Sequence, residues 1–145
     1  MNSGTSTWNG VTVADKGKGE NAGKLDVGTV FDVIGEFVNK GKDAVLDATK
    51  TAVTTVAGLL RNEGTANYDD MTVASGGTSN NSGYEKGDIL IIEDGGEHIN
   101  SGTSIWNNQT VQVGGSATTE EGGKETINDK YVIDGEKTNK GEIDA

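Results

Sequence analysis

The sequence predicts a mainly β protein: a parallel β-solenoid of repeats about nineteen residues long, with an α-helical segment or helical hairpin inserted after the first repeat. Glycines recur at a fixed spacing, and a β-branched residue follows each of them at a constant offset. Between residues 25 and 62 the apolar spacing becomes helical. We therefore expect an N-terminal β arm at 1–24, an amphipathic helix at 25–62 and solenoid repeats at 63–145.

Glycine opens each repeat. The starts lie 19, 19 and 21 residues apart and are followed by the opening of a further copy: Gly64, Gly83, Gly102, Gly123 and Gly141. Nine residues after a start comes a β-branched residue: Val73, Ile92, Val111 and Val132. An N-terminal copy repeats this offset with Gly4 and Val13. Such side chains stack well on a pleated surface, and one turn cannot bury its apolar face alone, so the copies should stack.

Two further positions recur in the repeat. A column four residues after the start holds Trp8, Tyr68, Trp106 and Ile127, with Gly87 as the exception. We expect this column to pack inward or to form an aromatic ladder. Gly-Gly pairs at 76–77, 95–96 and 114–115 predict corners with positive φ.

Residues 25–62 are expected to be helical. Apolar residues recur there at three- and four-residue steps, as in Val27, Val30, Phe31, Ile34, Phe37 and Val38. The stretch 39–43 could divide the segment into two helices, with Asp43 as the N-cap of the second. The apolar stripe would cover the solenoid or contact another subunit.

Composition and charge exclude several classes of function. The chain has 23 glycines, no cysteine and no proline, so disulfides and thiolate metal sites are excluded. Its net charge of −11 disfavours nucleic acid, and residues 63–145 hold sixteen acidic against five basic groups. Charged residues recur through 25–62, so we expect no membrane insertion, and no secretory signal of the usual kind opens the chain.

Catalytic and metal-binding patterns are absent from the sequence. The single histidine, His98, is expected to be a solvated turn residue. Asp94 and Asp134 share a repeat position, but Val113 stands between them in that column. The calcium-binding nonapeptide is missing, although weak calcium binding at 69–70 or 93–94 stays open. We therefore expect a non-enzymatic protein without cofactor or metal.

The repeat unit resembles a known family. Ser101-Gly-Thr-Ser104 with Thr110 to Gly115, and Met71 to Gly77 followed by Thr78, are similar to the passenger repeats of AIDA-type autotransporter adhesins. The resemblance covers roughly residues 2–17 and 63–140, a little over half of the chain. It implies a right-handed β-helix at the bacterial surface, an extracellular or cell-surface location, and a role in adhesion or self-association.

Two functions follow as expectations. An open solenoid presents strand edges at both ends, so the N-terminal arm could stack on the C-terminal edge of another copy and form a head-to-tail homopolymer. The expected interface residues are Thr5, Trp8, Val11, Val13, Tyr131, Val132 and Ile143. The alternative is a monomeric adhesin-type module that binds host cells, neighbouring cells or glycans; a phage fibre segment and an ice-binding solenoid are weaker alternatives.

Overall fold

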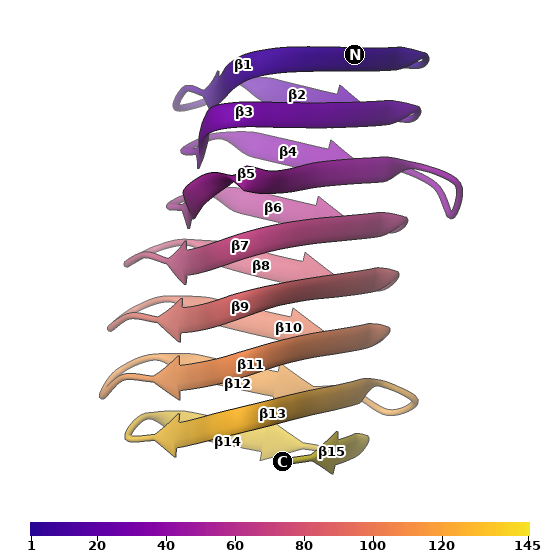
Figure 1. Ribbon diagram of the computed structural model, residues 1–145. Coiled ribbons are helices and arrows are strands. Elements are labelled where there is room, and N and C mark those ends of the chain that lie inside the picture. Colours follow the sequence, from indigo (N-terminus) through magenta and orange to yellow (C-terminus); the bar gives the residue numbers. More distant parts are fainter.

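A computed structural model describes residues 1–145 as fifteen β-strands without a helix. The strands form two parallel sheets, and the chain alternates between them, so that one long strand and the short strand after it make one turn of a solenoid (Figure 1). The first sheet contains β1 (Thr5–Val13), β3 (Lys24–Val33), β5 (Val45–Val56), β7 (Thr65–Val73), β9 (Tyr84–Ile92), β11 (Thr103–Val111), β13 (Lys124–Ile133) and β15 (Glu142–Asp144). The second contains β2 (Lys18–Asn21), β4 (Glu36–Asn39), β6 (Leu59–Asn62), β8 (Thr78–Asn81), β10 (Glu97–Asn100), β12 (Ser116–Thr119) and β14 (Glu136–Asn139).

The predicted parallel solenoid of turns about nineteen residues long is confirmed. Equivalent residues of successive repeats pair directly, as Thr103 does with Tyr84 on one side and Lys124 on the other. The Gly-Gly corners also behave as predicted, since Gly76, Gly95 and Gly114 have φ of 78°, 78° and 82°. The two ends of the chain lie at opposite ends of the stack (Figure 1).

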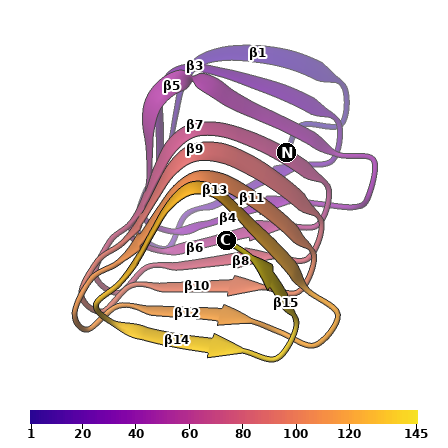
Figure 2. The same cartoon turned by 60° about the horizontal axis from the view of Figure 1, so that its bottom comes forward.

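Each long strand bends near its middle, as the arched long strands of Figure 2 show. In β7 the buried positions are Ala66, Tyr68, Met71 and Val73, so the inward residues are separated by two, three and two positions. The step of three marks the bend, where two adjacent residues both face outward. This geometry makes an alternating strand look partly helical in sequence.

The predicted helix at 25–62 is wrong, because this segment forms β3, β4, β5 and β6. In β3 the inward residues are Leu25, Val27, Phe31 and Val33, and a bulge between Val27 and Phe31 creates the four-residue step that resembled a helix. Val30 and Ile34, counted in the apolar stripe, are 41% and 47% exposed. No helix capable of crossing a membrane exists in the structure.

The strands of 25–62 join the N-terminal repeat to the later ones. β1 pairs with β3 and β5 pairs with β7, so residues 1–145 form one continuous stack. The expected N-terminal arm is therefore the first turn of its own solenoid. Phe31, Phe37, Leu46 and Leu60 fill the interior of this first half of the molecule.

The predicted column of β-branched residues exists in the structure, with one residue different from the prediction. Val13, Val73, Ile92 and Val111 all face inward in register. Val111 pairs with Ile133 instead of Val132, because β13 carries an extra residue at its bend. Val33 and Val56 complete the column in the segment taken for a helix.

The predicted aromatic column also faces inward. The rings of Tyr68 and Trp106 stack with centroids 6.0 Å apart at an interplanar angle of 10°. Gly87 lies in the turn between them, and a Cβ there would stand only 2.1 Å from the Trp106 ring. Gly87 therefore supplies the space into which the indole of the next turn extends.

Candidate functional site

The N-terminal end of the stack presents an open strand edge. β1 pairs with β3 on one side only, and its nine residues contain neither a charged residue nor a proline. A hollow of about 270 Å³ opens beside it, with Trp8, Val11, Val13 and Phe37 among its lining residues. Trp8 is 41% exposed, whereas the equivalent Trp106 is fully buried. Natural proteins commonly protect edge strands with charges or prolines, and β1 has neither.

At the C-terminal end of the stack, the last strand covers only part of the strand before it in the same sheet. β15 pairs only with Lys124, Glu125 and Thr126, so the rest of β13 has no strand on its outer side. Tyr131 and Val132 lie on this uncovered stretch and are half-buried, while Ile133 is 37% exposed. Burial and the neighbouring Glu125 carboxylate raise the pKa of Tyr131, so its hydroxyl stays neutral.

The predicted interface residues fall into two groups. Thr5, Trp8, Val11 and Val13 lie together on β1 at one end of the stack. Tyr131 and Val132 on β13, with Ile143 on β15, lie at the other end. The two groups can therefore meet only between different copies of the chain.

An asparagine ladder links the corners of the solenoid, and sequence reasoning missed it. In each pair the amide nitrogen of one asparagine donates to the side-chain oxygen of the next at 2.8–2.9 Å; the members are Asn2, Asn21, Asn39, Asn62, Asn81 and Asn100. Each amide also donates to a backbone carbonyl of the next turn, as Asn62 does to Tyr84. Thr119 then interrupts the ladder, and Asn139 occupies the next equivalent position.

The Asn-x-Gly spacing would have revealed this ladder. It recurs at 2–4, 21–23, 39–41, 62–64, 81–83, 100–102 and 139–141. The asparagine side chain fills the corner, and the glycine packs against the backbone of the neighbouring turn at every site except Gly4 and Gly41, where a Cβ would meet no atom within 4 Å. At Gly83, for example, a Cβ would stand 2.1 Å from the carbonyl oxygen of Gly64.

His98 is not the solvated turn residue expected from the sequence. It lies in β10 and points into the interior with 1% exposure, 3.0 Å from the carboxylate of Glu85. Ser104 donates to the same carboxylate at 2.7 Å and accepts from the Trp106 indole at 3.0 Å. A nucleophilic triad requires a serine hydrogen-bonded to histidine, but Ser104 bonds to Glu85. None of the surface hollows includes these residues.

A buried ion pair lies two turns further on. Lys137 forms a close ion pair with Glu125, and Thr119 donates to the same carboxylate at 2.9 Å. Burial alone would raise the pKa of Glu125, but Lys137, His98 and the hydrogen bonds together lower it below its usual value. Glu125 is thus held as a carboxylate inside the solenoid.

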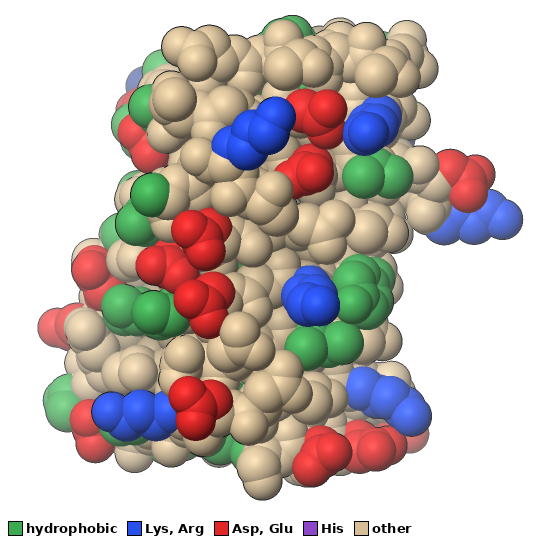
Figure 3. Space-filling view, in the orientation of Figure 1, with side chains coloured by type: hydrophobic (Ala, Val, Ile, Leu, Met, Phe, Trp, Pro, Cys, Tyr) green, Lys and Arg blue, Asp and Glu red, His purple; other side chains and the backbone are tan.

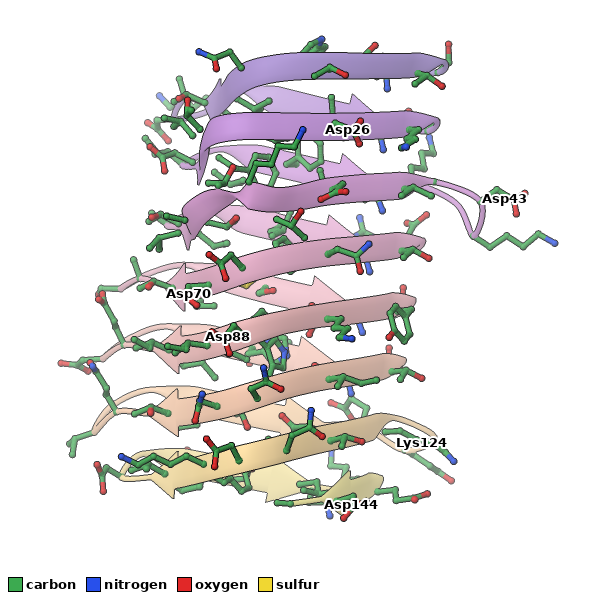
Figure 4. All side chains as sticks on the ribbon, viewed as in Figure 1. Asp26, Asp43, Asp70, Asp88, Lys124 and Asp144 are labelled. Carbon is green, nitrogen blue, oxygen red and sulfur yellow. The ribbon has the colours of Figure 1, made fainter.

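Acidic side chains lie close together on the outer face of the long-strand sheet (Figure 3). Oxygen atoms of Asp69, Asp70 and Asp88 all lie within 4.8 Å of one another. Asp70 and Asp88 project from the adjacent strands β7 and β9 (Figure 4). Burial and the neighbouring Asp69 and Asp88 raise the pKa of Asp70, although its hydrogen bond from Ile89 acts in the opposite direction. Glu93 and Asp94, the other calcium candidates, are outside this cluster.

Comparisons of the chain with protein-family models, curated proteins and solved structures give no significant match. The two uncovered ends of the stack are the most distinctive feature of its geometry.

Proposed function

We propose that this chain is a non-enzymatic structural protein that assembles head to tail into an extracellular or cell-surface fibre. The N-terminal turn of one copy stacks on the C-terminal turn of the next. Because the two contacting surfaces differ, the contact is heterologous and extends into a filament unless it closes into a ring. The extracellular location rests on the resemblance of the repeats to adhesin passenger repeats.

The observation that carries this proposal is the uncharged, uncovered edge of β1 beside a partly apolar hollow, whose lining also includes Lys18 and Glu20. Backbone donors and acceptors on such an edge can pair with a further strand, and partial covering of Trp8, Val11 and Val13 by the neighbouring copy would add a hydrophobic contribution. Charge also favours a head-to-tail orientation. Residues 120–145 carry eight acidic groups against four lysines, whereas residues 1–24 carry three lysines against two acidic groups.

The test compares two variants of β1 by sedimentation velocity and negative-stain electron microscopy across a concentration series. Val11→Lys places a charge in the hollow, whereas Asn9→Lys places the same charge at an exposed position of β1 that does not line the hollow. We expect concentration-dependent filaments for the wild type and Asn9→Lys. Val11→Lys should associate at least tenfold more weakly, which corresponds to about 1.4 kcal/mol. Wild-type protein that stays monomeric at every concentration overturns the proposal.

A monomeric adhesin-type module is the second candidate function. A polar hollow of about 370 Å³ on the outer face supports it, lined by Asp47, Thr49, Asn67, Tyr68, Lys86, Gly87, Asp88 and Asn107. Mixed donors and acceptors of this kind suit a hydroxyl-rich ligand such as a glycan. Glycan binding by a monomer that forms no filaments would favour this candidate over the fibre.

A further inference from the structure

The asparagine ladder defines how one turn is positioned on the next. Within the chain, Asn2 donates to Asn21 at 2.9 Å and to the carbonyl of Lys24 at 2.9 Å. The same step places Lys24 directly against Thr5 in the long-strand sheet. A displaced neighbour would leave these amides without partners, and burial of polar groups without partners is unfavourable. The ladder therefore fixes the register of each turn on the next.

The first and last asparagines of this corner column are complementary: Asn2 begins the ladder, and Asn139 lies beyond its interruption at Thr119. The side-chain oxygen of Asn139 accepts from the backbone of Gly141 at 3.1 Å, while its amide nitrogen donates to no group of the chain. The side-chain oxygen of Asn2 accepts from the Ser6 hydroxyl at 2.8 Å and receives no amide from a preceding turn. One end thus lacks an acceptor and the other lacks a donor of the same kind.

We propose that the junction between two copies has a single register, in which Asn139 of one copy donates to Asn2 of the next. This inference rests on the proposed head-to-tail assembly. The step that relates Thr5 to Lys24 within the chain then places Thr5–Thr7 of the second copy against Glu142–Asp144 of the first. β15 becomes an inner strand of a sheet that continues from one copy into the next.

The remainder of the junction is a notch. β15 occupies only the start of its layer, so the uncovered part of β13 faces β1 of the second copy across two strand spacings, roughly 9.6 Å. Trp8, Val11 and Val13 line one wall, and Tyr131 and Ile133 line the other. The backbone edges in the notch remain accessible to water, so we expect weak, reversible association.

Engineered cysteines test the register, because the chain has none of its own. Thr7 and Asp144 are both exposed and share one outward-facing column; Asp144 is labelled on the last strand in Figure 4. Across the junction their Cα atoms would lie roughly 4.8 Å apart, within disulfide range. Within one chain they are roughly 34 Å apart, seven strand spacings, so a disulfide between them must join two copies. The matched control pairs Asp144→Cys with Thr12→Cys, which lies on β1 roughly 16 Å from position 7.

The outcomes distinguish a failure of the register alone from a failure of head-to-tail assembly. Oxidation of mixed T7C and D144C proteins should give a covalent dimer in high yield, while T12C with D144C should not. Filaments in the wild type with equal crosslinking of both pairs, or with none, overturn the register and leave head-to-tail assembly standing. The absence of both filaments and crosslinks overturns assembly and register together.

The ladder contact has its own test. Asn139 is exposed, so Asn139→Asp should leave the fold intact while replacing the amide donor with a carboxylate opposite the Asn2 oxygen. We expect at least tenfold weaker assembly by sedimentation. Gln112→Glu adds the same charge at an exposed corner away from both ends and should assemble like the wild type. Equal behaviour of the two variants contradicts the Asn139–Asn2 contact.

Discussion

A substitution at the single residue Gly87 would show how closely the interior is packed. Alanine at this position would place its Cβ 2.1 Å from the Trp106 ring, so the stacked pair of Tyr68 and Trp106 must move. We expect Gly87→Ala to lower the free energy of unfolding by about 1–3 kcal/mol, as overpacking of a core does. Denaturant unfolding gives the loss, and near-ultraviolet circular dichroism reports the displacement of Trp106.

Gly4→Ala is the matched control, because a Cβ there meets no atom within 4 Å. Its stability should stay within about 0.5 kcal/mol of the wild type, as for most surface substitutions. An equal loss in both variants would mean that glycine flexibility, and not the space beside Trp106, decides the effect.

The asparagine corners hold successive strands in register. Asn62 stands in the middle of the ladder. It donates to Asn81 and Tyr84 and accepts from Asn39, at 2.8 Å in each case. Asn62→Ala leaves buried partners of two turns without hydrogen bonds, so we expect a loss of about 2–3 kcal/mol in denaturant unfolding. Asn80→Ala, on the outward face of the same strand β8 as Asn81, is the control and should cost less than about 0.5 kcal/mol. Similar losses in the two variants would refute the structural role of the ladder.

The sequence predicts a strand well where the strand has a regular bend, and poorly where a bulge adds residues to that bend. The later turns were predicted because Gly64, Gly83 and Gly102 recur without insertions. The segment 25–62 has a helix-like apolar spacing because bulges in β3 and β5 lengthen the steps between inward residues. Periodicity alone cannot distinguish a bent, bulged strand from a helix, but Asn39-x-Gly41 and Asn62-x-Gly64 mark solenoid corners in that same segment.

The candidate site was predictable to a similar degree. The edge residues of β1 and β13 follow from their places in the terminal repeats. The burial of His98 does not, because its neighbours Glu85 and Ser104 come from different turns. Only the alternation within Glu97–Asn100, with Asn100 as the inward corner residue, places His98 on the inner face.

Across the whole molecule, the interior changes character along the axis of the stack. Phe31, Leu46 and Leu60 fill the first turns, whereas Glu85, His98 and Glu125 are buried in the later ones. Removal of one partner from a buried ion pair leaves an uncompensated charge, so the later turns depend on the ionisation of Glu125, which is paired with Lys137. Asp70, on the outer face, acts in the opposite direction: its pKa is raised, so its repulsion of neighbouring carboxylates is relieved by acid. That effect is small because the group is largely solvated.

Acid should therefore open the C-terminal turns before the N-terminal ones. Because the folded-state pKa of Glu125 lies below its usual value of 4.5, its stabilising contribution is complete above that pH and is lost as the pH falls through the folded-state pKa. Hydrogen exchange with mass spectrometry at a series of pH values, corrected for intrinsic rates, should show loss of protection in β13 and β14 first. In Glu125→Gln these strands should be less protected at neutral pH, and their selective acid response should be reduced. Loss of protection that begins in β1 and β3, or at one pH throughout the stack, would contradict this account and indicate that the solenoid unfolds as a single cooperative unit.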